Sequence, residues 1–193
     1  MLKFKVDDHS YWVNDRQLPS VTEIIRFLNV DIIGSANKEA KEAAAERGTR
    51  IHEACTMYDF DPTADVDGDI VGYIKAYADF KRDYGVKDWS MFETIVGNEH
   101  YAGTLDRYGK IDGVPTILDI KTGSKLHMKT HAVQLAGYTE LLLEDRKPVE
   151  QGAILHLKKD GAYTLKIVDI DELCDAYLIF KRCLELHKYL KGA

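Results

Sequence analysis

Residues 101–123 read YAGTLDRYGKIDGVPTILDIKTG, and the two halves of this stretch have the pattern of paired strands. The runs 101–110 and 115–121 are each bounded by glycine-containing turns, as strands commonly are. Asp112-Gly113 between them is a dipeptide typical of a tight hairpin turn. We therefore predict an antiparallel hairpin here, preceded along the chain by a third strand over 91–99.

One acidic residue lies in each strand of this hairpin. Asp106 stands in GTLDRYG and Asp119 in TILDIKTG, so pairing of the strands brings the two carboxylates together near one end of the sheet. Asp119 and Lys121 are two residues apart, so their side chains point to the same face. Charges among strand-forming residues cost stability unless they are paired or bind a metal. A lone DxK pattern more often marks an exposed salt bridge, which stays the alternative at this point.

The chemistry of these residue types favours a hydrolytic metal site. Two carboxylates close together repel each other, and a divalent cation removes that repulsion. Hard oxygen ligands at this density suit Mg²⁺ or Mn²⁺. A lysine beside them can position or deprotonate a water and stabilise negative charge on a phosphate.

Residues on two predicted helices add to this pattern. Gly48 and His52 are four apart, hence on one face of an alanine-rich helix, where a glycine costs about 1 kcal/mol relative to alanine. We interpret Gly48 as leaving room for close approach of a strand, metal or substrate beside His52, a candidate imidazole ligand. Gln134 and Tyr138 have the same spacing on the helix that follows the hairpin. A histidine alone is more often packed or exposed.

The segment between the hairpin and that helix is locally basic. No acidic residue lies between Lys121 and Gln134, and the stretch contains Lys125, Lys129 and His131. We expect these three residues to receive a phosphate backbone, with an ordinary solvated loop as the alternative.

The remaining segments alternate between helical and strand patterns. Ser20 and Glu23 have the spacing of a capping box, so a helix is expected to begin there. The other expected elements are a hairpin over 4–15, a helix over 35–59, a helix over 70–85, a helix over 130–146, a hairpin over 151–170 turning at Asp160-Gly161, and a helix over 171–190.

This order predicts an α/β (α+β) fold in which helices flank a mixed central sheet. We expect one domain over 1–193, with an N-terminal hairpin in 1–17, a motif-bearing core in 18–145, and a C-terminal hairpin and helix in 146–193.

Composition narrows the class of protein further. The 193 residues carry 26 Lys and Arg against 32 Asp and Glu, a net charge of −6, which argues against a protein that simply coats nucleic acid. A nuclease needs only a local basic patch. Three scattered cysteines exclude a disulfide framework and a four-cysteine cluster, and favour a reducing cytoplasm. No apolar run approaches the roughly 20 residues of a membrane span, so we expect no membrane partner.

Taken in order, four motifs resemble the RecB-like branch of the PD-(D/E)XK nuclease superfamily. That branch has GxxH on a helix, GxxD on a strand, DxK on the next strand and QxxxY on the following helix. Here they stand as Gly48 to His52 (spelled GxxxH), Gly103 to Asp106, Asp119 to Lys121, and Gln134 to Tyr138. The segment LPSVTEII near the start is similar to the opening of small phage and prophage members, which implies a cytoplasmic site of action.

The resemblance implies a restriction-endonuclease-like core and a role for each motif residue. Asp106 would be the central metal ligand, Asp119 the second carboxylate, and His52 would complete the metal shell. The backbone carbonyl of Ile120 would also bind the metal, and Lys121 would orient the attacking water. Gln134 and Tyr138 would contact DNA or brace the lysine, and Glu93 would lie near the site on the preceding strand, although an exposed strand glutamate is the equal alternative.

The activity implied is that of a Mg²⁺- or Mn²⁺-dependent exonuclease acting on single-stranded or duplex DNA ends, without an iron–sulfur cluster. It fits recombination, repair or phage DNA processing, with a separate recombination or replication protein as partner. A structure-specific endonuclease or junction resolvase, which would be an obligate dimer, is the closest alternative. A catalytically silent module that binds DNA or a partner, and a phosphatase acting on small molecules, come from other classes.

Overall fold

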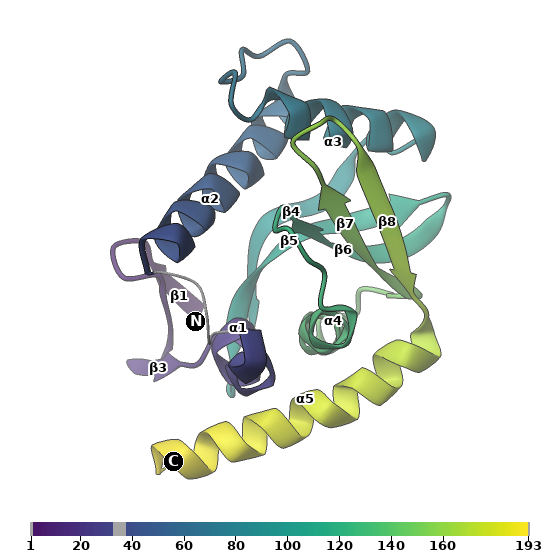
Figure 1. Cartoon of the computed structure of the whole chain (residues 1–193). Helices are drawn as coiled ribbons and strands as arrows, with labels where there is room; N and C mark the ends of the chain where they lie inside the picture. Colours follow the sequence, from purple (N-terminus) through teal and green to yellow (C-terminus); the bar gives the residue numbers. More distant parts are fainter. Residues whose placement is uncertain (1, 33–37, 193) are drawn as a thin grey trace.

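The computed structural model describes residues 2–32 and 38–192, and its centre is a five-stranded mixed sheet in the order β4-β5-β6-β7-β8 (Figure 1). Antiparallel pairing joins all neighbours except β6 and β7, which run parallel. Because parallel neighbours need a crossover, the chain between them forms helix α4 (Met128–Glu144), which packs on the sheet. The strands are β4 (Trp89–Gly97), β5 (Ala102–Ile111), β6 (Val114–Lys121), β7 (Gln151–Leu157) and β8 (Tyr163–Val168).

Both predicted hairpins of this sheet are confirmed. β5 and β6 pair around Asp112-Gly113, where both residues have the positive φ that such a turn requires. β7 and β8 turn at Asp160-Gly161. The strand predicted over 91–99 is confirmed as β4, which pairs with β5.

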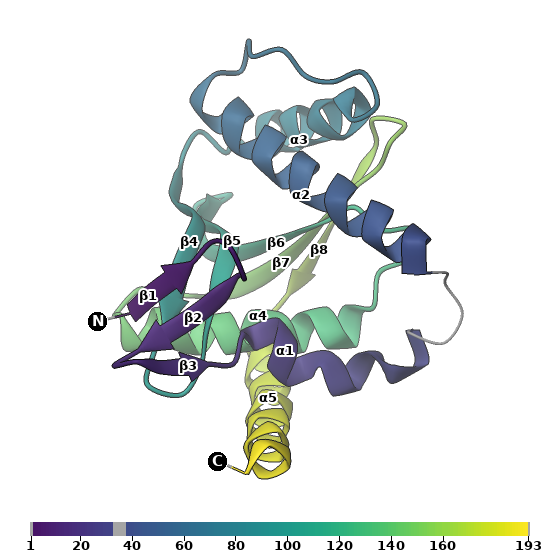
Figure 2. The same cartoon turned by 90° about the vertical axis from the view of Figure 1, so that its left-hand side faces the viewer.

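Helices cover both faces of the sheet. On one face lie α2 and α3, and on the other lie α1 and α4, with α5 packed across α4 on the side away from the sheet (Figures 1 and 2). The mixed α/β class with helices flanking a mixed sheet is therefore confirmed, and it is consistent with a restriction-endonuclease-like core. The bounds are α1 (Val21–Ile24), α2 (Lys38–Phe60), α3 (Val71–Asp83), α4 (Met128–Glu144) and α5 (Ile170–Lys191).

Each face of the sheet has its own apolar core because strand residues alternate between the faces. Ile117 of β6 packs into the α4 and α5 core, whereas Leu118 and Ile120 pack into the α2 and α3 core. Asp119 and Lys121 follow the alternation of Ile117 and therefore point toward α4. The alternation thus decides which helix meets the charged end of β6.

The N-terminal region forms a separate antiparallel sheet of β1 (Leu2–Lys5), β2 (Ser10–Val13) and β3 (Arg16–Leu18). Its first two strands confirm the predicted hairpin, while three-residue β3 was not predicted because its pattern is too short to detect. The predicted helix start is confirmed, since Ser20 is the N-cap residue and its Oγ accepts the Glu23 amide at 3.0 Å. The helix that it starts is short: after α1 the chain continues as a 3₁₀ helix, η1 (Ile25–Ile32).

The contact between α4 and α5 depends on a glycine. A Cβ at Gly137 of α4 would lie 2.7 Å from Cε2 of the Phe180 ring, closer than packed carbon atoms can approach. We predict that Gly137→Ala lowers the free energy of unfolding by roughly 1–3 kcal/mol, despite the better helix propensity of alanine. Gly68→Ala is the control, because no described atom lies within 4 Å of the new methyl group. Urea unfolding measures both, and an equal effect would contradict this packing.

Candidate metal centre

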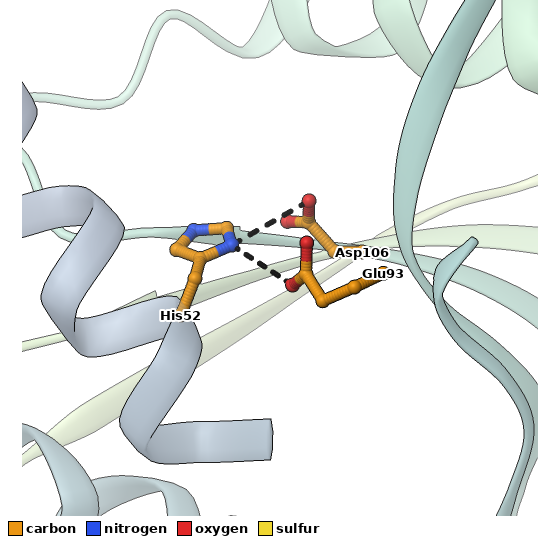
Figure 3. A group of neighbouring side chains, drawn as sticks. All are labelled: His52, Glu93 and Asp106. Atoms are coloured by element: carbon orange, nitrogen blue, oxygen red, sulfur yellow. Dashed lines mark hydrogen bonds and ion pairs between the residues drawn. The ribbon is translucent and has the colours of Figure 1, made fainter. Parts of the chain in front are cut away.

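Three side chains from three elements converge between α2 and the sheet (Figure 3). His52 of α2 points its Nδ1 at Glu93 Oε1 of β4, 3.4 Å away, and at Asp106 Oδ1 of β5, 3.6 Å away. One ligand atom from each residue lies within 4.8 Å of the others, a spacing that could hold a metal ion. The structure thus brings together three residues that are far apart in the sequence.

The backbone places the two carboxylates of this cluster. Glu93 has a φ of +41°, a left-handed conformation unusual for a non-glycine residue, in a strand whose register with β5 shifts between Trp89 and Met91. Asp106 Oδ2 accepts the backbone amide of Ile120 at 2.6 Å, beyond the last paired residues of the β5–β6 ladder. This bond fixes the carboxylate and leaves Oδ1 facing His52.

The imidazole of His52 is oriented by the neighbouring strand. Its Nε2 lies 3.2 Å from the carbonyl oxygen of Ile120, which can only accept a hydrogen bond. A proton on Nε2 therefore leaves Nδ1 to face the carboxylates, which is the arrangement that a metal-binding histidine needs. Burial opposes the charged imidazole, but Asp106 and Glu93 outweigh it and raise the pKa of His52 to about 9.

Asp119 and Lys121 form a second group on the other side of β6. Lys121 Nζ lies 2.8 Å from Asp119 Oδ2, and Gln134 of α4 contacts both residues, at 3.0 Å from Asp119 and 3.3 Å from Lys121. Burial disfavours the charged lysine, yet Asp119 and Asp106 outweigh it and raise its pKa, so Lys121 is held as a cation. Burial raises the pKa of Asp119 against the opposing effect of Lys121.

The donor set fits a hard divalent cation. Asp119 Oδ2 is buried and accepts no hydrogen bond from the described residues, so a lone pair remains for a cation beside the Lys121 ion pair. Carboxylate oxygens and one imidazole are ligands that Mg²⁺ and Mn²⁺ accept. Among the described residues, the cluster of atoms within 4.8 Å comprises His52, Glu93 and Asp106, and Asp119 lies outside it.

Arg107 lies behind this centre and was not predicted from the sequence. Its side chain is completely buried and donates to Glu93 at 3.0 Å and to Asp59 of α2 at 3.0 Å. Two further bonds go to the carbonyl of Asp106, at 2.7 Å, and to Thr56, at 2.9 Å. Arg107 therefore ties the backbone of one candidate ligand and the side chain of another to α2. The one sequence feature that could have identified Arg107 is its charge inside a predicted strand, directly after Asp106.

The other motif residues pack around the centre rather than lining an open surface. Tyr138 is buried, and a Cβ at Gly103 would lie 2.6 Å from its Oη, so the glycine of the GxxD motif makes room for this ring. Gly48 has no comparable neighbour: a Cβ there would lie 3.9 Å from Thr122 Oγ1, an ordinary contact. Crowding by the described atoms therefore does not explain why a glycine stands at position 48.

The three residues expected to receive a phosphate backbone are dispersed. Lys125 is exposed in the loop after β6. Lys129 lines a hollow between α4 and α5, on the face of α4 away from Gln134. His131 is half-buried near Lys121, and burial, followed by the charge of Lys121, lowers its pKa to about 4, so the imidazole is neutral at neutral pH. The structure does not gather these residues into one basic patch.

No family model matches the chain, and no curated protein matches it. Among solved structures, a phage related exonuclease from Haemophilus somnus 129PT is 14% identical, with a TM-score of 0.38 over 90% of this chain and 96% of that chain. A protein named SSO0001 is 17% identical, with a TM-score of 0.40 over 91% of this chain and 79% of that chain. Likeness at this level assigns neither a family nor an activity.

Within residues 2–32 and 38–192, no helix combines the length and the apolar character needed to cross a bilayer.

His52 gives the metal-free protein a pH-dependent stability. Its folded pKa of about 9 lies above the ordinary 6.5, so the stabilisation is complete below pH 6.5 and is lost as the pH rises toward 9. In EDTA, we expect the melting temperature of the wild type to fall over this range more steeply than that of His52→Gln. His100→Gln, in an exposed loop, is the control and keeps the wild-type slope. Parallel curves for wild type and His52→Gln would contradict this electrostatic account.

Removal of Arg107 takes from buried Asp59 one of its two cationic partners, the other being Lys81, and leaves the remaining donors of this network rearranged. We predict that Arg107→Met lowers the free energy of unfolding by roughly 3–5 kcal/mol in urea titrations. The control is Arg82→Met, which removes exposed ion pairs with Asp79 and Asp83 and should cost far less. Equal losses in the two variants would show that Arg107 has no special place in the fold.

Proposed function

We propose that the chain is a metal-dependent DNA nuclease of the RecB-like PD-(D/E)XK type that hydrolyses phosphodiester bonds. The observation that carries this proposal is the convergence of His52, Glu93 and Asp106 in one cluster. The Asp119–Lys121 ion pair lies near enough for the charge of Asp106 to raise the pKa of Lys121. A salt bridge alone, the alternative for a DxK pattern, gives no reason for three further ionisable groups beside it.

The residues proposed to hold Mg²⁺ or Mn²⁺ are Asp106, Glu93 and His52 through its Nδ1, with Asp119 beside them. The carbonyl of Ile120 faces His52 Nε2 and would orient the imidazole rather than bind the same ion. When bound, the cation would lower the pKa of a water and neutralise charge on the phosphate. Lys121, held as a cation, would orient that water and stabilise the negative charge that develops on the phosphate oxygens. Gln134, through its contacts with Asp119 and Lys121, would keep these two side chains in a fixed relation.

A hollow just beyond the end of β6 is the proposed path for the DNA backbone. It has a volume of about 250 Å³ and lies where the parallel strands β6 and β7 end, the position at which open α/β sheets commonly bind ligands. The residues that line it include Thr122, Ser124, His156, Lys158 and Lys159. We propose that this hollow, rather than Lys129, holds a phosphate next to the one that is cut.

The turn that carries these lysines is held against α3. A Cβ at Gly72 would overlap the carbonyl oxygen of Lys159, so only glycine allows α3 to approach so closely. Lys158 is fixed further by its backbone bonds to Ala162 and Gly161. A turn fixed in this way supports a binding surface that is formed before DNA arrives.

The proposed substrate is a DNA end, single-stranded or duplex, and the proposed setting is the cytoplasm of a cell or of a phage-infected host. This part of the proposal rests on the motif resemblance. A separate recombination or replication protein would supply any motor, because the sequence contains no helicase motif.

The proposal is tested with end-labelled linear single-stranded DNA, linear duplex and closed circular DNA in Mg²⁺, Mn²⁺ or EDTA. We predict metal-dependent loss of linear DNA with the circles spared. Asp119→Asn and Lys121→Ala should each lower the rate by roughly 10²–10⁴-fold, because each removes a group that acts on the reacting phosphate or water. Asp145→Asn removes an exposed carboxylate and is the matched control.

Each other outcome has a definite meaning. Cut circles would replace the exonuclease with an endonuclease at the same site. Cleavage that survives in Asp119→Asn would contradict the site. No cleavage by the wild type, combined with DNA binding in EDTA, would leave a silent binding module.

A further inference from the structure

The outward face of α5 carries large apolar side chains in contact with solvent. Leu178 is 56% exposed, Ile179 48% and Leu186 44%, although the opposite face of the helix is buried against α4 through Leu173 and Phe180. Figures 1 and 2 show α5 along the edge of the molecule, with its outward side turned away from the sheet and from α4. Exposed apolar side chains grouped on one helix face commonly mark a protein interface.

The charges around this apolar centre are arranged symmetrically. The sequence D175-x-x-L178-I179-x-x-R182 places an acid three residues before the apolar pair and a base three residues after it. Asp175 and Arg182 are seven residues apart, about two helical turns, so both flank the same face. When this segment is laid antiparallel on a copy of itself, Leu178 meets Leu178 of the other copy and Ile179 meets Ile179, because the two side chains lie about 100° apart around the helix. Each Asp175 meets the other copy's Arg182. The segment is therefore complementary to itself.

A hollow beside the apolar pair would bury the side chains of an opposing helix. It has a volume of about 640 Å³, and its apolar lining comes from Ile179 and Ala176 of α5, Ala132 and Val133 of α4, and Leu28 of η1. Asp175 and Glu172 stand at its rim with Lys129. An apolar floor inside a charged rim is the usual anatomy of a protein–protein contact.

We propose that α5 pairs antiparallel with α5 of a second copy of this chain, around a two-fold axis that passes between Leu178 and Ile179. In a two-fold contact the same surface serves both partners, so self-complementary charge is what such a contact requires. Nucleic acid would need a face with net positive charge, whereas Asp175 and Arg182 balance each other here and Glu172 and Glu185 add negative charge. A second copy is therefore the occupant that the residues favour.

The contact is expected to be reversible rather than obligate. One exposed apolar stripe on a single helix is a small surface beside the total burial of roughly 1,200–2,000 Å² in stable complexes. α5 lies across α4 from the sheet, while His52 is on α2 at the other face, so the pairing covers neither copy's candidate metal centre. The inference does not depend on the proposed nuclease activity.

Sedimentation velocity over a wide range of protein concentration tests the pairing on the full chain. We expect a concentration-dependent monomer–dimer equilibrium for the wild type. Asp175→Arg and Arg182→Asp should each weaken it at least about tenfold, because each variant places like charges opposite each other. The double variant exchanges the charges and should restore the wild-type equilibrium. Lys181→Glu, on the opposite flank of α5, is the control and should leave it unchanged.

The substituted side chains are exposed, so these variants are expected to fold, and circular dichroism verifies it. A wild type that stays monomeric at all concentrations would overturn the proposal. Association that survives both single charge reversals would overturn it as well. Loss of association in the single variants without recovery in the double variant would contradict the antiparallel arrangement.

Discussion

The ends of β5 and β6 must accommodate like charges in a place that water hardly reaches. Asp106 and Asp119 stand on neighbouring strands, and the carboxylate of Asp119 is almost fully buried. Carboxylates buried together repel each other and lose hydration, and each effect alone would destabilise the fold. Cationic side chains on both sides of β6 offset this repulsion: His52 faces Asp106, and Lys121 faces Asp119. A divalent cation would complete this compensation.

The compensation extends into the core through Arg107. This buried guanidinium bonds Glu93 and Asp59, and Asp59 in turn pairs with Lys81 of α3. A chain of charges therefore runs from the candidate ligands through α2 to α3. Breaking such a chain costs more than its net contribution to stability where the charge left behind is buried, as that of Asp59 is. The same residues that stabilise the packing of α2 on the sheet also keep Glu93 and Asp106 in position.

Much of the fold could be predicted from local patterns. Asp112-Gly113 and Asp160-Gly161 marked the turns of both hairpins in the central sheet, and the Ser20–Glu23 capping box marked a helix start. These signals work because the responsible interactions lie within a few residues of each other. The length of that helix and the short strand β3 were not predicted, since packing rather than local sequence decides them.

The candidate site could be predicted only in part. The spacing of Asp119 and Lys121 predicted that their side chains point to the same face of the sheet, because strand periodicity is local. The convergence of His52, Glu93 and Asp106 depends on how α2 crosses the sheet, which residue spacing does not reveal. The prediction that these three residues share a site came from the motif resemblance. The role of Arg107 and the position of Lys129 on the α5 side of α4 depend on tertiary packing. The sequence around Arg107 and Lys129 contains no periodic pattern that predicts the role of the first or the position of the second.

The most direct test of the central claim is a crystal grown with Mn²⁺ and analysed by anomalous diffraction. The account predicts one strong peak coordinated by Asp106, Glu93 and the Nδ1 of His52, with the carboxylate of Asp119 beside it. A peak at another position, or none here at saturating Mn²⁺, would contradict the claim that these buried charges form a metal centre.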